Sequence, residues 1–144
     1  MTDDDTRTVM EAYLGALLGN ADFERFLAPD VVWTTMETGQ ETHGRHAVRD
    51  LITSLHTQVF DARPELVSLV CGDGTATIEA VFDGRQTGEF AGVPARGAHV
   101  RIPYAVCYDV ADGLITALRA YFPMAALRDR LAGGDRPVSA IPTT

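Results

Sequence analysis

Hydrophobic positions along this chain recur at two spacings, and the spacing changes near the middle. In the first part, apolar side chains return every three to four residues over residues 5–18 and 45–60, as in helices with one buried face. A shorter helix is expected over 22–28, where an Asp would cap its start and a Pro would end it. The β-branched and aromatic residues 31–35 predict a strand between these helices.

After the second long helix the spacing becomes two, which is typical of half-buried strands. A last short helical segment follows, with apolar positions at Met124, Leu127 and Leu131. Helices followed by strands in hairpins predict an α+β fold, a curved antiparallel sheet wrapped against N-terminal helices. The expected strands are 65–71, 75–82, 98–110 and 114–122, and Asp112-Gly113 is the strongest turn signal among them.

The bulk composition narrows the range of partners. The chain has 144 residues, enough for one hydrophobic core, and we expect a single domain over 1–132 and a flexible tail over 133–144 that is rich in Gly, Pro, Ser and Thr. The net charge of −8 disfavours nucleic acid and anionic membrane surfaces as partners. No apolar run approaches a membrane span and the acidic N-terminus lacks a signal-peptide pattern, so a cytoplasmic protein is expected. Cys71 and Cys107 are interpreted as small, reduced core residues.

The longest predicted strand has two different faces. One presents Val100, Ile102 and Tyr104, and the other presents Arg101 and Cys107 among small or polar neighbours. Neither face is charged throughout, so both are expected to be at least partly covered. One face would pack the helices and line a pocket for a hydrophobic small molecule, and the second would meet another subunit in a homodimer.

Four stretches of the sequence carry a family resemblance. Over about residues 5 to 132 the chain resembles the SnoaL-like polyketide cyclase group of the nuclear-transport-factor-2-like superfamily. The resemblance implies a cone-shaped, usually dimeric α+β barrel with an apolar pocket, and a Gly/Pro-rich loop beside the pocket mouth. This superfold hosts cyclases, isomerases, dehydratases, epoxide hydrolases and non-catalytic binding modules. The supporting stretches are LAPDVVW (27–33), THGRHAVRDLI (42–52), TGEFAGVPARG (87–97) and DGLITALRAY (112–121).

The chain also departs from its relatives at positions that matter for catalysis. By the resemblance, Thr35 stands near the position where ketosteroid isomerase has its catalytic base, an Asp. Ala105 or Val106 stands near the protonated Asp of that enzyme, and the long-strand acid of SnoaL-like cyclases is also missing. Gln86 occupies a loop position where the family often has a histidine. The chain is therefore not expected to be a ketosteroid isomerase.

Four residues are candidates for proton transfer in a dry pocket. Tyr13, whose spacing to the end of the first helix resembles that of ketosteroid isomerase, would donate a hydrogen bond to an oxyanion, or would simply be a core aromatic. Glu37 could replace the missing base if the strand continues past Thr35, or could be a solvated loop residue. His43 and His99 lie at loop edges, where each could titrate near neutrality or merely be exposed.

A second group of residues could bind the substrate. Trp33 and Tyr104 are expected either to wall the pocket or to pack in the core, and Tyr121 is expected to shape the pocket. Arg119, in an apolar strand, requires a partner. It could hold a substrate carboxylate or phenolate, or form a structural ion pair with Glu79 or Asp109.

These candidates favour a cofactor-independent enzyme over other classes. The expected activity is an acid/base cyclase or isomerase of polyketide-type secondary metabolism. The alternatives are an epoxide hydrolase or epoxide-opening cyclase on the same fold, or a non-catalytic, dimeric, small-ligand-binding module. No cofactor is expected, and no metal either, because Glu41, His43 and His46 lack a known zinc spacing.

Overall fold

A single curved sheet organises the computed structural model, which describes residues 2–19 and 21–133. Within that part of the chain the sheet has seven strands: six follow the order β2-β1-β7-β6-β5-β3, and the seventh, β4, pairs with β5. The strands are β1 (Leu27–Thr35), β2 (Gln40–His43), β3 (Phe60–Ala62), β4 (Glu65–Cys71), β5 (Thr75–Gln86), β6 (His99–Ala111) and β7 (Leu114–Tyr121). The helices are α1 (Asp3–Leu18), α2 (Arg45–Thr53) and α3 (Met124–Ala132), with a 3-10 turn at Glu24–Phe26 and a π-helical turn at Ser54–Gln58.

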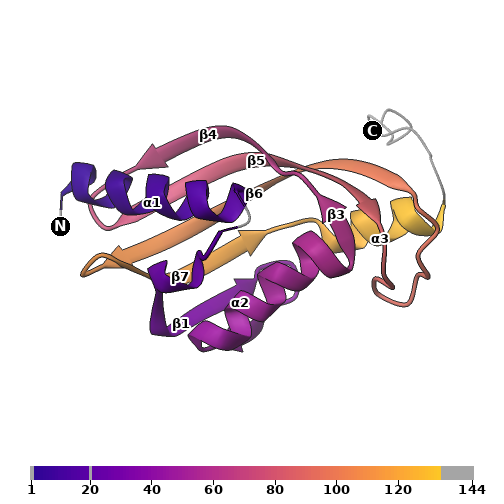
Figure 1. Cartoon of the computed structure of the whole chain (residues 1–144), viewed down its shortest axis with the longest axis horizontal. Helices are drawn as coiled ribbons and strands as arrows, with labels where there is room; N and C mark the ends of the chain where they lie inside the picture. Colours follow the sequence, from indigo (N-terminus) through magenta and orange to yellow (C-terminus); the bar gives the residue numbers. More distant parts are fainter. Residues whose placement is uncertain (1, 20, 134–144) are drawn as a thin grey trace.

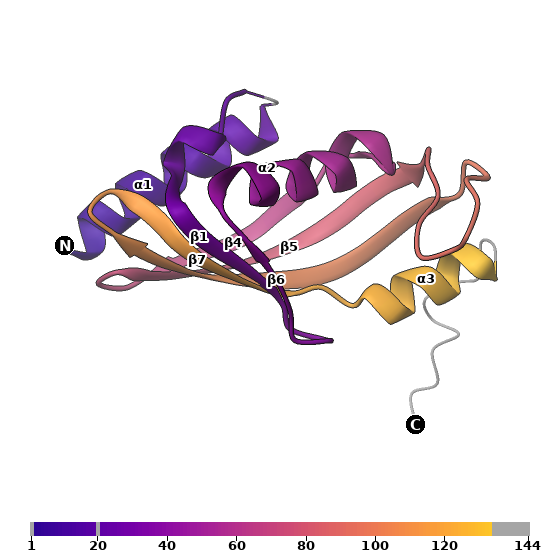
Figure 2. The ribbon, with the colours of Figure 1, turned by 90° about the horizontal axis from the view of Figure 1, so that it is seen from below.

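The predicted α+β class is confirmed, and α1 and α2 lie on the same face of the sheet (Figures 1 and 2). α3 lies at the end of the sheet, beyond β7. Most strand pairs are antiparallel, but β1 runs parallel to β7. These two strands are joined through the rest of the sheet and not by a hairpin, so no turn forces them to be antiparallel. The sheet is therefore mixed, where a purely antiparallel one was expected.

The hydrophobic core forms where α1 and α2 pack on this face. Met10, Tyr13 and Leu14 of α1 are buried, as are Val48 and Ile52 of α2, which confirms the helical spacing of their apolar residues. The buried Thr6 side chain accepts a hydrogen bond from the Gly74 amide at 2.9 Å and ties α1 to the turn before β5. This hydrogen bond fixes the N-terminal part of α1 against the sheet.

The hairpin agrees with expectation and so does Cys71, which packs against the core, whereas Cys107 lies on the opposite face of the sheet and not in the core. Asp112 and Gly113 both adopt positive φ, 53° and 79°, as the two central residues of a type I′ turn require. Cys71 and Cys107 are free and partly buried. Of the expected flexible tail at 133–144, residues 134–144 lie outside the described residues.

Other predicted boundaries were wrong. The expected helix over 22–28 is a 3-10 turn followed directly by β1, which includes Pro29. Pro29 is exposed where the pairing of β1 with β7 shifts register, so its missing N–H costs no ladder hydrogen bond. The expected strand over 75–82 continues to Gln86, and the short strands β2 and β3 were not foreseen. With four and three residues, these two are too short to show an alternating pattern.

The second long helix also differs from its prediction over 45–60. α2 ends at Thr53, and the next residues form a π-helical turn in which the Val59 amide donates to the Ser54 carbonyl at 2.8 Å. A π turn inserts one extra residue and rotates the side chains that follow it. This rotation matters because the turn carries His56.

Candidate functional site

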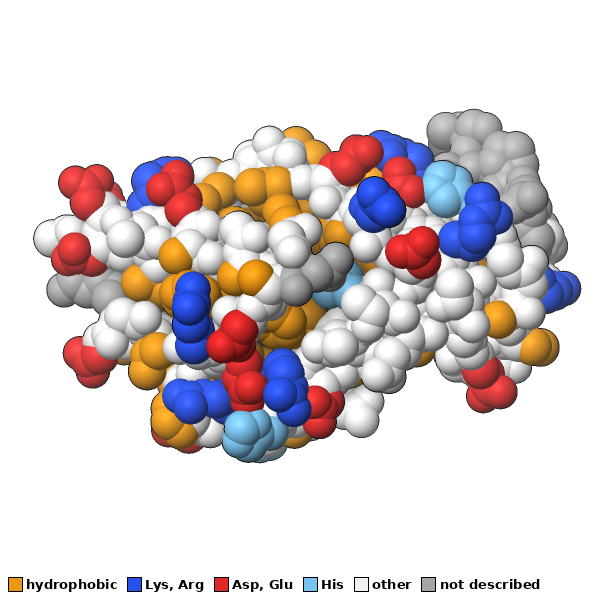
Figure 3. Space-filling view, in the orientation of Figure 1, with side chains coloured by type: hydrophobic (Ala, Val, Ile, Leu, Met, Phe, Trp, Pro, Cys, Tyr) orange, Lys and Arg blue, Asp and Glu red, His pale blue; other side chains and the backbone are white. Residues whose placement is uncertain are grey.

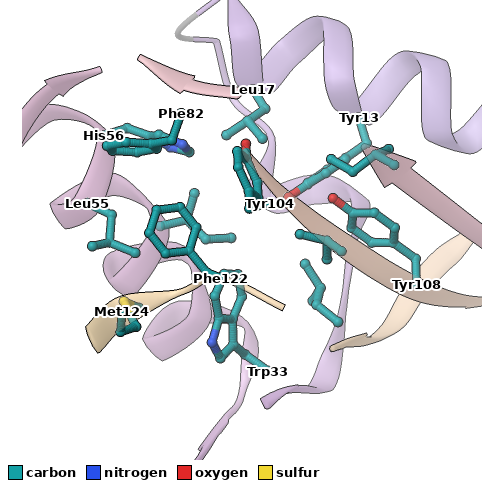
Figure 4. Close-up of a pocket in the computed structure, with 14 residues that line it drawn as sticks. Tyr13, Leu17, Trp33, Leu55, His56, Phe82, Tyr104, Tyr108, Phe122 and Met124 are labelled. Atoms are coloured by element: carbon teal, nitrogen blue, oxygen red, sulfur yellow. The ribbon is translucent and has the colours of Figure 1, made fainter. Parts of the chain in front are cut away.

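A pocket opens between the helices and the curved face of the sheet (Figure 4). Its volume is about 50 Å³ and it is lined by fourteen residues, most of them aromatic or aliphatic. We call it the aromatic pocket. Within the described chain no arginine, lysine, aspartate or glutamate lines it. Its polar groups come from five lining residues: Tyr13, Trp33, His56, Tyr104 and Tyr108.

Three tyrosines bring their hydroxyls into the pocket. Tyr13 comes from the buried stripe of α1, while Tyr104 and Tyr108 lie on the same face of β6. The rings of Tyr13 and Tyr108 meet edge to face at 5.9 Å, and Figure 4 shows their hydroxyls pointing toward one another. Burial raises the pKa of all three phenols, that of Tyr104 to about 12. These hydroxyls therefore stay protonated and can donate hydrogen bonds.

His56 supplies the group that can accept a proton. Its imidazole stacks on the Phe82 ring with centroids 6.2 Å apart and an interplanar angle of 23°. Burial lowers the pKa of His56 to about 4, so the ring is neutral at neutral pH. A neutral imidazole offers one nitrogen as a proton acceptor. The pocket thus combines one potential base with three potential hydrogen-bond donors.

Sequence reasoning missed His56. It lies four residues after Ile52, on the same face of the predicted helix, and this spacing was the available signal. The position of His56 also depends on its contact with Phe82 on β5 and on the π turn, and no local sequence pattern predicts either of these.

Trp33 and Tyr104 line the pocket, which was one of the two interpretations given for each residue. Tyr13 lines it as well. The Trp33 indole N–H donates to the Thr35 hydroxyl at 3.1 Å. Thr35 therefore lies on the same face as Trp33, and by the resemblance it stands where a relative has its catalytic Asp. The hydroxyl at this position orients an indole ring.

The remaining catalytic candidates lie outside the aromatic pocket. The Glu37 carboxylate accepts from the Ala125 amide at 3.2 Å, so it caps the start of α3. His43 is exposed and lies 2.8 Å from Glu41. His99 is also exposed and contacts Asp83.

Arg119 and Tyr121 project from β7 away from the pocket. The Arg119 guanidinium binds both oxygens of Asp109, at 2.9 and 3.1 Å, which is one of the ion pairs expected from sequence. Tyr121 is 49% exposed. With Met36 and Glu37 it lines a separate, open hollow beside Phe122.

The Gly/Pro-rich loop between β5 and β6 does not line the aromatic pocket. The amides of Thr87 and Gly88 donate to the Val59 carbonyl at 2.8 and 3.0 Å, and the Thr87 hydroxyl donates to Gln58. The buried Gln86 side chain holds the loop by donating to the carbonyls of Gly88 and Val93. The loop therefore anchors the end of the π turn that carries His56.

The described residues contain neither a candidate metal site nor a membrane-spanning helix. Among residues 2–19 and 21–133, no group of three or more His, Cys, Asp or Glu side chains is placed to hold a metal ion. None of the helices in those ranges is long and apolar enough to cross a membrane.

Comparison with known proteins identifies the family. The family model described as SnoaL-like domain matches residues 11–118. No curated protein matches the chain at a significant level.

Solved structures share the fold at low sequence identity. A provisionally assigned SnoaL-like polyketide cyclase from Jannaschia sp. CCS1 superposes with a TM-score of 0.81 at 17% identity, over 94% of this chain and 96% of that one. A provisionally assigned polyketide cyclase from Xanthomonas campestris gives 0.76 at 21%, over 91% and 99%. AclR from Streptomyces galilaeus, provisionally named a hydroxylase, gives 0.76 at 17%, over 92% and 98%. At such identities the likeness concerns the fold, and the chemistry must be argued from the pocket.

Proposed function

This chain belongs to the SnoaL-like domain family, and on that premise we propose that it is a cofactor-independent enzyme that isomerises or cyclises a hydrophobic carbonyl compound. The proposed substrate is of polyketide type, from secondary metabolism. One observation carries the proposal: a neutral imidazole and three protonated phenols share an apolar pocket without any carboxylate among its described lining residues. This pairing of one base with several hydrogen-bond donors suits proton transfer next to a carbonyl.

In the proposed reaction, His56 removes a proton from the carbon next to the substrate carbonyl. The electron pair of that C–H bond moves toward the carbonyl oxygen, and the hydroxyl of Tyr13 or Tyr108 donates a hydrogen bond to this developing oxyanion. The proton then returns from His56 to another carbon in an isomerisation. In a cyclisation, the carbanion instead attacks a second carbonyl of the same molecule, whose oxygen receives the proton.

The apolar surroundings help this base in spite of its low pKa. A neutral base that takes a proton becomes a cation at the moment when the substrate becomes an anion. The two charges attract each other strongly in a site from which water is excluded. The cost of charging His56, which lowers its pKa in the free protein, is therefore offset once the enolate forms beside it.

The same residues also suit epoxide opening, which we keep as a second candidate. A phenol with a high pKa can donate to an epoxide oxygen, and His56 can remove the proton from an attacking hydroxyl or water. This alternative is supported by the placement of the donors and the base on different elements. The tyrosines lie on α1 and β6, and His56 lies on the π turn.

A homodimer is part of the proposal. The middle of the sheet face opposite α1 and α2 carries no helix of the described chain (Figure 2). Its side chains are small or paired, among them Ala105, Cys107, Ala117 and the Arg119–Asp109 ion pair, and all of these are only partly exposed. Such a face can meet its copy across a two-fold axis. Light scattering after size exclusion would test the dimer, and a monomer over the whole concentration range would contradict it.

The activity can be tested without the natural substrate. 2-Tetralone, an aryl-fused ketone with acidic α-protons, should exchange those protons for deuterium faster in D₂O with the protein present, as followed by NMR. His56→Gln should abolish the acceleration, and Tyr13→Phe should reduce it by about tenfold or more while the melting temperature stays within a few degrees. Tyr121→Phe, outside the pocket, is the matched control and should leave the rate unchanged.

Two results would contradict the proposal. If 2-tetralone binds but exchanges no faster than in buffer, the chain is a binding module. If Tyr13→Phe unfolds the protein but leaves the exchange rate of its folded fraction unchanged, Tyr13 is a core residue only.

A further inference from the structure

A second, larger hollow adjoins the aromatic pocket. It has a volume of about 290 Å³ and lies where the end of α1 faces the π turn and the link between β3 and β4. We call it the outer pocket. Its charged lining residues are Asp61 and Arg63, which alternate with Ala62 and Pro64. The space-filling view shows hydrophobic side chains in the middle of the face carrying α1 and α2, with charged ones gathered toward its edges (Figure 3).

Leu17 and His56 separate the two pockets, because they are the two described residues that line both. Figure 4 shows them at the same edge of the aromatic pocket, with the Tyr104 hydroxyl pointing toward Leu17. Leu17 is partly exposed near the end of α1, and the π turn holds His56 opposite. A molecule that crosses this partition touches the candidate base on its way.

The volumes show that one compartment is not enough. A space of about 50 Å³ holds only about three to five water molecules, which is less than a benzene-sized cavity of about 150 Å³. A ring compound that reaches the tyrosines must therefore displace the partition and extend into the outer pocket. The part that remains outside meets charged groups in place of aromatic ones.

We propose that the substrate spans both pockets, with an apolar ring in the aromatic pocket and a carboxylate in the outer pocket against Arg63. Arg63 is the one arginine or lysine of the described chain that lines either pocket. Its side chain forms no ion pair or hydrogen bond with another described residue. A guanidinium presents a fork of donors that matches a carboxylate. This inference names the substrate class of the proposed function and relies on it for the role of the inner pocket.

Asp61 also lines the outer pocket, and its charge should affect carboxylate binding in the direction opposite to that of Arg63. Its carboxylate, two residues from Arg63, repels an anionic ligand while the guanidinium attracts it. Removing one charge or the other should therefore change carboxylate affinity in opposite directions.

Binding of two naphthalenes tests the proposal. Naphthalene-2-carboxylate and the uncharged naphthalene-2-carboxamide have the same ring and nearly the same shape, and calorimetry gives both affinities. Arg63→Gln should weaken carboxylate binding by about three- to tenfold and change carboxamide binding by less than about twofold. Asp61→Asn should tighten carboxylate binding. Glu37→Gln, in the hollow at the other end of the aromatic pocket beside Phe122, is the control and should change neither.

The partition has a separate kinetic readout. Leu17→Ala should speed association of the carboxamide severalfold in stopped-flow measurements, because it shortens the side chain between the pockets. Leu66→Ala, which shortens an exposed leucine that lines neither pocket, is its control and should leave the association rate unchanged.

Three results would overturn the two-pocket site: binding of neither naphthalene, an equal effect of Arg63→Gln on both, or sensitivity to Glu37→Gln in place of Arg63→Gln. These measurements need no turnover. Arg63-dependent binding without deuterium exchange of 2-tetralone would retain the site and reject the enzyme, and the reverse pattern would retain the enzyme and reject Arg63.

Discussion

Burial of His56 should make the stability of the protein depend on pH in a defined window. In an unfolded chain the imidazole has a pKa of 6.5, and in the fold burial lowers this pKa to about 4. Between these values the unfolded state binds more protons than the folded state, so the free energy of unfolding falls as the pH falls. The effect is absent well above 6.5 and reaches its limit below about 4.

The magnitude follows from the two pKa values. One pKa unit corresponds to about 1.4 kcal/mol, so full protonation should lower the free energy of unfolding by roughly 3 kcal/mol. About 2 kcal/mol of this decrease should appear between pH 7 and pH 4.5. Urea unfolding followed by circular dichroism at several pH values measures it. Carboxylates titrate in the same range, so the useful quantity is the difference between the wild type and His56→Gln.

His56→Gln should flatten this part of the profile, since glutamine does not titrate. Parallel profiles for the wild type and His56→Gln would refute the reasoning. They would mean that the imidazole is solvated in the folded protein and is no neutral base.

Three further predictions concern other parts of the fold. Gly88→Ala should lower the free energy of unfolding in urea by about 1–3 kcal/mol, because the new Cβ would lie 2.8 Å from the Gln58 carbonyl oxygen. Gly15→Ala is the contrasting variant: its Cβ would have no atom within 4 Å, so it should stabilise α1 by up to about 1 kcal/mol. Leu127→Ala should cost about 2–5 kcal/mol by the same assay, since Leu127 is fully buried. Arg119→Ala should leave 2-tetralone exchange unchanged, because the ion pair of Arg119 with Asp109 faces away from the pocket.

Periodicity predicted those features that depend on one element alone. The buried stripe with Met10, Tyr13 and Leu14 is visible in the sequence, and so is the type I′ turn at Asp112. Pro29 misled the prediction because a proline that ends a helix and one exposed in an irregular strand look alike locally. The difference between them is made by β7, a strand more than 80 residues away in sequence.

The candidate site was predicted only in part for the same reason. Tyr13 was named because its spacing resembles that of ketosteroid isomerase, and Trp33 and Tyr104 because each is an aromatic residue in an apolar strand. His56 depends on a π turn that in turn depends on hydrogen bonds from the loop at Thr87 and Gly88.

The change of base has a chemical consequence. A carboxylate base enters the reaction as an anion and leaves it neutral, whereas His56, as the base proposed here, would enter neutral and leave as a cation. The proposed intermediate is therefore an ion pair in an apolar pocket, and the hydrogen bonds from Tyr13 and Tyr108 must stabilise its anion in place of water. The proposed position of a substrate carboxylate outside the aromatic pocket, at Arg63, fits this intermediate, since a second anion beside the enolate would oppose its formation.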